Sequence, residues 1–226
     1  MKRIFAYVAA LVCACVEAAT WTGGGDGSSW GDPANWGGML PTATEDVAIA
    51  TGTGEKTINL GGTDREMGAL TVTGAGKLTL SGAGALVAQR ISSSVNLDVD
   101  APVTLKTGGN VVHVAAANRT IEFRKPVAAL GQKHIQFTSE NSNGPMYVNF
   151  RDVFTAPQAT MLMQFGSTGS TESTSVHFYG KVTLAKLSCC SSGYRSGWCY
   201  LHASGNAIAA TGVCYGGIVL AAENAL

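Results

Sequence analysis

The sequence predicts an all-β protein, and three observations support this. Charged residues make up 13% of the 226 residues, whereas Gly occurs 29 times, a composition poor in the Lys and Glu that favour helices. Hydrophobic residues make up 46%, too many for a disordered chain. Short runs of alternating apolar and polar residues recur between Gly, Asn, Ser and Thr, as in strands bounded by turns.

Net charge and motifs exclude several classes of function. Fifteen basic residues balance fifteen acidic ones, and without a basic stripe we expect no nucleic-acid partner. The sequence contains no G-x-S-x-G, H-E-x-x-H or P-loop motif. We therefore expect no cofactor and predict no catalytic residue.

Residues 1–18 have the pattern of a secretory signal peptide. Lys2 and Arg3 precede an uncharged apolar run over residues 4–16, and small residues follow up to Ala18 and Ala19. The run is too short to span a bilayer, which needs about 20 residues. We expect cleavage after Ala18 and a secreted or cell-surface protein, with no membrane span in the mature chain.

A Trp-rich segment occupies residues 19–46 and contains Trp21, Trp30 and Trp36. Two interpretations of these rings stay open. They can cap the open end of a solenoid, which otherwise exposes apolar side chains and unpaired strand edges. Alternatively, they can form a glycan-binding platform, because exposed indole rings stack on sugars.

Three acidic residues in this segment are weak candidates for calcium ligands, and no other metal site is expected. They are Asp26, Asp32 and Asp46, whose carboxylate oxygens suit Ca²⁺. Their spacing does not match a calcium-binding repeat, so the favoured interpretation is that they stabilise turns.

From residue 47 to 226 the strand-like runs recur at a longer period. Leu97, Phe123, Phe150 and Phe178 each end an apolar–polar–apolar triplet and lie 26, 27 and 28 residues apart. A unit of three short strands cannot bury its own apolar faces, so stacked units would form one internal column. This pattern predicts a β-solenoid, most simply a parallel β-helix, with a β-sandwich or jelly roll as the alternative.

The N-terminal pattern of Trp21, Trp30, Asn35, Trp36 and Pro41 resembles the opening of secreted and surface proteins with autotransporter-associated β-strand repeats. The resemblance covers about the first 50 residues. It implies a β-helical passenger displayed or released outside the cell, and it implies no particular activity. Family members are often much longer, and residues 216–226 look like a repeat cut short, so we expect a chain truncated at its C-terminus.

Four cysteines follow the predicted signal peptide: Cys189, Cys190, Cys199 and Cys214. In an oxidising compartment they suggest two disulfides, with three possible pairings. Adjacent cysteines rarely bridge each other, so we expect Cys189 and Cys190 each to bond Cys199 or Cys214. This would staple a Cys-rich loop at residues 188–199; zinc binding, which prefers other spacings, is the alternative.

Two functions remain open. The favoured one is a structural or adhesin-like β-helical protein without catalytic activity, whose partner is a cell-surface glycan or protein. The alternative is a carbohydrate-active β-helix, either a polysaccharide lyase or a hydrolase, or a glycan-binding module. An enzyme would need carboxylates gathered on one strand face. The aligned triplets predict two outward rows, namely Asn96, Glu122, Asn149 and His177, and Asp98, Arg124, Arg151 and Tyr179.

Overall fold

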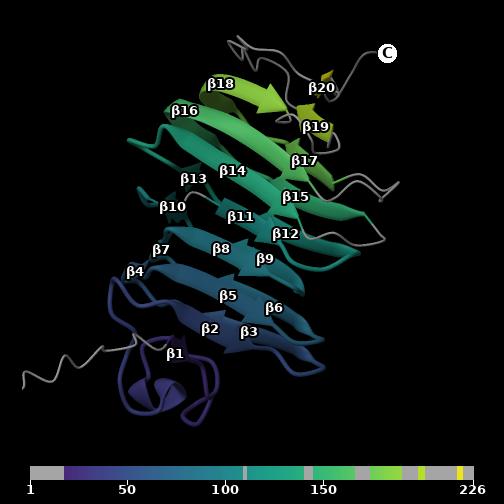
Figure 1. The fold of residues 1–226 in the computed structure, drawn as a ribbon. Helices are drawn as coiled ribbons and strands as arrows, with labels where there is room; N and C mark the ends of the chain where they lie inside the picture. The colour runs from purple at the N-terminus through teal and green to yellow at the C-terminus, as the bar shows by residue number, and fades with distance from the viewer. Residues whose placement is uncertain are drawn as a thin grey trace, which may run out of the picture.

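The computed structural model describes residues 18–108, 111–139, 145–165, 174–189, 198–201 and 218–220. Its strands wind into a β-solenoid of about six turns, here called coils. Equivalent strands of successive coils lie side by side and pair in parallel (Figure 1). The predicted parallel β-helix is confirmed. The sandwich alternative is wrong, because sandwiches are built from antiparallel sheets.

Four successive coils contribute one strand to each of three faces. Face A contains β1 (Ala19–Thr20), β2 (Val47–Ala50), β5 (Ala69–Thr73), β8 (Arg90–Ser93), β11 (Val111–Val114) and β14 (His134–Ser139). Face B contains β3 (Glu55–Asn59), β6 (Lys77–Ser81), β9 (Asn96–Asp100), β12 (Arg119–Phe123), β15 (Met146–Phe150), β17 (Thr174–Phe178), β19 (Trp198–Leu201) and β20 (Ile218–Leu220). Face C contains β4 (Arg65–Glu66), β7 (Leu86–Ala88), β10 (Val103–Leu105) and β13 (Val127–Ala128).

Two longer strands join face C to face A. The first part of β16 (Phe154–Phe165) pairs with β13, and its second part pairs with β14. β18 (Val182–Cys189) follows β16 through the same corner, with a register shift between Ala156 and Thr160. This continuity is why the two faces form a single sheet.

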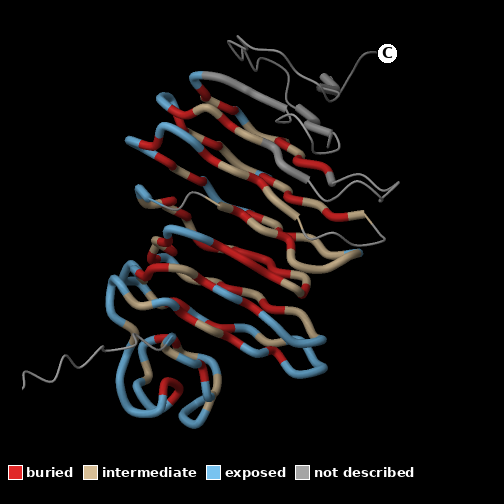
Figure 2. Tube along the Cα trace, in the orientation of Figure 1, coloured by how far each residue is buried: buried red, intermediate tan, exposed pale blue. Residues whose placement is uncertain are grey.

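The core fills the space between the three faces. Figure 2 shows buried positions alternating with exposed or intermediate ones along most strands, as the two-residue period of a strand requires. In β8 and β9, three consecutive residues are buried. The rings of Phe123, Phe150 and Phe178 stack nearly parallel, with centroids 4.9 and 4.8 Å apart. The predicted internal column of these three residues is therefore confirmed, and all three are essentially inaccessible to solvent.

The predicted column is wrong at its first member. Phe123 lies beside Val99, whereas Leu97 lies beside Ile121. The alignment is off by one full period of the strand, and such a shift keeps every side chain on the same side of the sheet. The apolar–polar alternation therefore fits both registers, and the length of chain between β9 and β12 decides between them.

The Trp-rich segment lies at one end of the stack, beneath β2 and β3 (Figure 1). β1 pairs with β2, and a single bridge joins Ser29 to Asn59. A short 3₁₀ helix, η1 (Pro33–Trp36), ends at Gly37, whose φ of 73° is the left-handed conformation that glycine tolerates. Within the described ranges, no helix is long and apolar enough to cross a membrane.

Truncating the centre of the aromatic column should destabilise the whole stack. Phe150 contacts two stacked rings and the edges of two others, Phe137 and Phe154. We expect Phe150→Ala to lower the free energy of unfolding by about 3–5 kcal/mol, measured by urea denaturation. The control is Thr71→Ala, on the exposed side of face A, which should change it by less than about 0.5 kcal/mol. If both variants lowered the free energy of unfolding equally, the central role of the aromatic column would be contradicted.

Candidate binding face

The outward side of face B carries a connected row of charged and amide side chains. We call this set the charge ladder: Lys77, Asp98, Glu122, Arg124, Asn149 and Arg151. Its members come from β6, β9, β12 and β15 and from the residues directly after β12 and β15. The parallel register brings them together, because Asp98 lies beside Glu122 and Glu122 beside Asn149.

Asp98 is held by cations from the coil on either side. Its Oδ2 lies 2.6 Å from Lys77 Nζ and accepts a hydrogen bond of 2.8 Å from an Arg124 guanidinium nitrogen. The side chain is 12% exposed. The aspartate therefore joins three successive coils through charge-assisted hydrogen bonds, which are stronger than neutral ones.

Glu122, one coil further on, contacts one cation from its own coil and one from the next. Its Oε1 lies 3.5 Å from Arg124, and its Oε2 lies 3.2 Å from Arg151 and accepts a hydrogen bond of 3.3 Å from Asn149. Two carboxylates on neighbouring strands repel each other. Arg124 contacts both of them and relieves this repulsion, so the ladder is one network and not a series of separate pairs.

The basic groups are more exposed than the acidic ones. The side chains of Asp98 and Glu122 are 12% and 15% exposed, whereas those of Lys77, Arg124 and Arg151 are 33%, 47% and 41% exposed. The carboxylates thus lie close to the sheet and the cations above them. The solvent-facing layer of the ladder is positive, although the whole chain has no net charge.

Aromatic side chains continue the ladder on the next coils. The guanidinium of Arg151 lies 4.0 Å from the ring centroid of Tyr179, a cation–π contact. Partial burial opposes the charged form of Arg151, but hydrogen bonds and charge interactions with Glu122 and Tyr179 outweigh it and raise the pKa of Arg151. The rings of His177 and Tyr179 lie 6.1 Å apart at 28°, and Tyr147 meets His177 edge-on at 5.9 Å.

The sequence located most of this face but not its register. It predicted Glu122, Asn149 and His177 in one row, and Arg124, Arg151 and Tyr179 in the next, as the structure has them. The placement of Asp98 and Asn96 is wrong by one strand period, because Asp98 and not Asn96 lies beside Glu122. The sequence analysis missed Lys77 and Tyr147. Both lie at outward positions near the start of a face B strand, and this position could have identified them as members of the same surface.

The three Trp rings of the N-terminal segment are buried. Trp21, Trp30 and Trp36 are 4%, 2% and 7% exposed. Trp36 meets Trp21 edge-on at 4.9 Å and Trp30 at 4.7 Å, and its Nε1 donates to the Trp30 carbonyl at 2.7 Å. Rings packed in this way close the end of the core. They leave no free face on which a sugar could stack, so the geometry disfavours the platform interpretation.

A buried asparagine organises the loop around the Trp cluster. Asn35 is fully buried, and its Oδ1 accepts from the backbone N–H groups of Gly25 and Gly27, each at 3.0 Å. Its Nδ2 donates to Asp26 Oδ1 and to the Ser29 carbonyl, each at 2.9 Å. All four hydrogen-bonding positions of the amide are therefore satisfied. This role explains why asparagine stands at that point of the Trp-rich pattern.

The three calcium candidates are used as backbone acceptors. Asp26 accepts from the N–H groups of Ser28 and Ser29, and Asp32 accepts from Asp26 and Ala34. Asp46 accepts from the Ala69 N–H in the adjacent coil. In the part of the chain that the structure describes, no three His, Cys, Asp or Glu residues gather as a metal site. The geometry therefore favours the turn interpretation of these carboxylates over calcium binding.

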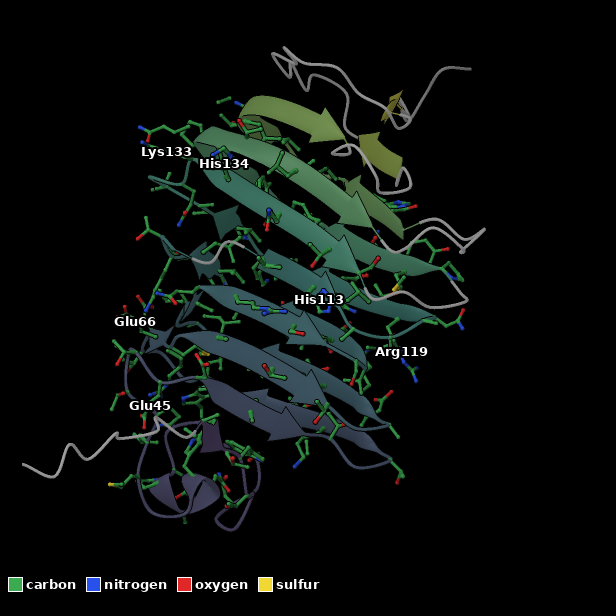
Figure 3. All side chains as sticks on the ribbon, viewed as in Figure 1. Glu45, Glu66, His113, Arg119, Lys133 and His134 are labelled. Carbon is green, nitrogen blue, oxygen red and sulfur yellow. The ribbon has the colours of Figure 1, made fainter. Side chains whose placement is uncertain are left out.

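A lysine connects the Trp-rich segment to the solenoid. Lys106 Nζ donates to the Ala43 carbonyl at 2.8 Å and to Glu66 Oε1 at 3.0 Å. Figure 3 shows Glu45 and Glu66 along the edge of the molecule near this segment. Glu45 caps its own turn by accepting from the Thr42 N–H at 2.6 Å, which lowers the pKa of Glu45.

The predicted disulfides involve residues that the structure describes only in part. Cys189 lies beside Met163 in the face A register, and Cys199 lies beside Val176 on face B. Their side chains, together with Cys190, Cys214 and most of the predicted loop at residues 188–199, lie outside the described residues. The disulfide pairing stays a prediction.

Comparison with known proteins adds no relative. No protein-family model matches the chain, and neither a curated protein nor a solved structure matches it. The functional argument therefore depends on the chain's own residues.

Glu122 should stabilise the ladder. We expect Glu122→Gln to lower the free energy of unfolding by about 1–2 kcal/mol, between the values for exposed and buried ion pairs, because it leaves Arg124 and Arg151 without a shared carboxylate. The measurement is urea denaturation at low ionic strength. The matched control is Glu55→Gln, on the same face and exposed, which should be neutral. A neutral Glu122→Gln would contradict the proposed network.

Asp26 should make the stability of the cap pH-dependent. Hydrogen bonds from Ser29, Ser28 and Asn35 hold the pKa of Asp26 well below its usual range. A depressed pKa stabilises the fold above the unfolded-state value of about 3.9, and the gain is lost as the pH falls towards the folded-state pKa. We expect Asp26→Asn to lower the urea midpoint at pH 7 and the difference from wild type to narrow with acidification. A difference that does not depend on pH would argue against this role.

Proposed function

We propose that this protein is an exported β-helical scaffold, secreted or displayed at the cell surface, that acts as a structural or adhesin-like protein without catalysis. The observation that carries the proposal is the state of the two carboxylates on face B. Asp98 and Glu122 each contact two cations, and both are largely covered. A general acid or base must exchange a proton with a substrate, whereas these groups orient the basic side chains above them.

The architecture supports the same proposal. The strands of each face pair in register, except for one shift between β16 and β18, so outward side chains form a rigid, extended surface. The described end of the solenoid is closed by the Trp cluster, which protects its edge from pairing with other chains. These features favour a protein that presents a surface for binding.

The proposed export fits the position of the first described strand. β1 begins at Ala19, directly after the predicted cleavage site, and the Ala19 N–H donates to the Asp46 carbonyl at 2.8 Å. Cleavage after Ala18 would convert this amide to an ammonium group, which can make the same hydrogen bond. The Trp cluster and its Asn35 network lie wholly after that point.

A carbohydrate-active enzyme is the second candidate, and one observation favours it. Asp98, Glu122 and Arg124 lie together on one strand face, as a polysaccharide lyase or hydrolase would require. The two candidates differ in what Glu122→Gln removes. In a scaffold it removes stability, whereas in an enzyme it removes turnover. Cleavage of a polysaccharide that depends on Glu122 would overturn the non-catalytic proposal.

Export should remove the predicted signal peptide as far as Ala18. We expect full-length protein produced in a bacterial host to appear outside the cytoplasm with Ala19 as its N-terminal residue, measured by fractionation and N-terminal sequencing. The matched control is Ala18→Arg, which places a large charged side chain where the cleaving enzyme needs a small one. It should accumulate uncleaved. Wild-type protein that stays in the cytoplasm with Met1 in place would contradict the proposed localisation.

A further inference from the structure

The end of the charge ladder nearest β17 combines positive charge with aromatic rings. Three cations, Lys77, Arg124 and Arg151, contact two carboxylates. The bonded network therefore carries a net positive charge. Because the carboxylates are the less exposed partners, this charge is concentrated at the solvent side and favours an anionic ligand.

The two arginines are held in place from beneath. Arg124 contacts Asp98 and Glu122, and Arg151 contacts Glu122 and lies against the ring of Tyr179. These contacts cost the guanidinium groups part of their rotational freedom before any ligand binds, which lowers the entropy cost of binding. A guanidinium offers five N–H donors, so the hydrogen bonds with Glu122 and Tyr179 still leave donors of Arg151 for a ligand carboxylate or sulfate.

The aromatic rings stand next to the arginines on the following coils. His177 and Tyr179 lie on the same side of one strand and its extension, and their rings lie side by side with planes 28° apart. Tyr147 approaches His177 edge-on from the neighbouring coil. All three residues are partly exposed. Such rings suit the C–H faces of pyranose sugars, which are apolar although the sugar edges carry hydroxyl groups.

We propose that this part of face B, formed by Arg124, Arg151, Tyr147, His177 and Tyr179, binds acidic polysaccharides. The anionic group of the glycan, a carboxylate or a sulfate, takes the exposed guanidinium donors, and the adjacent ring lies against the aromatic residues. Successive coils repeat at about 4.8 Å, so a linear polymer lying along face B meets both arginines in turn. The inference rests on the proposed binding function and names its ligand class.

Affinity electrophoresis and calorimetry with the purified, full mature chain test this proposal. The probes are polygalacturonate for the carboxylate, dextran sulfate for the sulfate, neutral dextran for sugar rings without charge, and polyphosphate for charge without sugar rings. We expect binding to at least one acidic polysaccharide, weakening as salt screens the charges, and none to neutral dextran. If polyphosphate binds as tightly as both acidic glycans, the proposed contact between sugar rings and aromatic side chains is wrong. If the protein binds neither acidic glycan, the whole proposal is wrong.

A set of variants assigns the binding to these residues. Arg151→Gln should weaken glycan binding by about tenfold or more, equivalent to about 1.4 kcal/mol, and Tyr179→Ala should weaken glycan binding more than polyphosphate binding. Arg151→Gln also lowers the net charge of the ladder. The double variant Arg151→Gln/Glu122→Gln removes one cation and one carboxylate, so it keeps that net charge, and it should still lose affinity for the glycan.

The control variant is Arg90→Gln, which removes an exposed arginine from face A. It should bind as wild type does, and circular dichroism should show that every variant keeps the β fold. If both Arg151 variants bind within about twofold of wild type, the assignment is wrong. If the wild-type protein is exported and cleaved after Ala18 but binds neither acidic glycan, the ligand class alone is overturned, so the two proposals fail separately.

Discussion

Parallel, in-register stacking of coils is the constraint on which the rest of this structure depends. Each residue lies about 4.8 Å above its equivalent in the previous coil, so like positions meet like positions over the length of the molecule. Inside, this rule turns Phe123, Phe150 and Phe178 into a stack. Outside, it would set carboxylate against carboxylate at Asp98 and Glu122. A low content of charged residues is one solution to this problem, and the Arg124 bridge is another.

The same constraint makes the end of the stack a special site. A terminal coil has no neighbour to cover its apolar edge or to receive its backbone hydrogen bonds. The N-terminal segment supplies both, through the buried Trp cluster and through contacts with β2 and β3. This segment has little regular structure of its own, so Asn35 and Asp26 replace strand pairing by accepting backbone N–H groups. Glycan stacking would need the Trp rings and calcium binding would need the carboxylates, but the rings are buried and the carboxylates accept backbone hydrogen bonds.

The sequence predicted the fold class because alternation, turn residues and a regular longer repeat all favour stacked strands. It predicted the core column from Phe123 onwards, where coil lengths are regular. It failed at Leu97 because the coil from Val99 to Phe123 is shorter than the coil from Phe123 to Phe150, and alternation alone does not distinguish shifts by a full strand period. The ladder was only partly predictable for the same reason. Whether Asp98 lies beside Arg124 or Glu122 depends on the register. Lys77 joins the network because its long side chain reaches Asp98 on the neighbouring strand.

The contacts between coils also determine how such a molecule can change in length. The described strands pair with those of neighbouring coils, as Val47 lies beside Leu70 near one end and Phe150 beside Phe178 further along. Duplicating or deleting one whole coil would therefore leave every other pairing intact and would lengthen or shorten face B by one step. An insertion of one additional strand would instead move every later strand onto a different face and break the ladder, whereas the corner loops absorb small differences in coil length. Gene rearrangements in whole-coil units are thus the changes that this architecture tolerates.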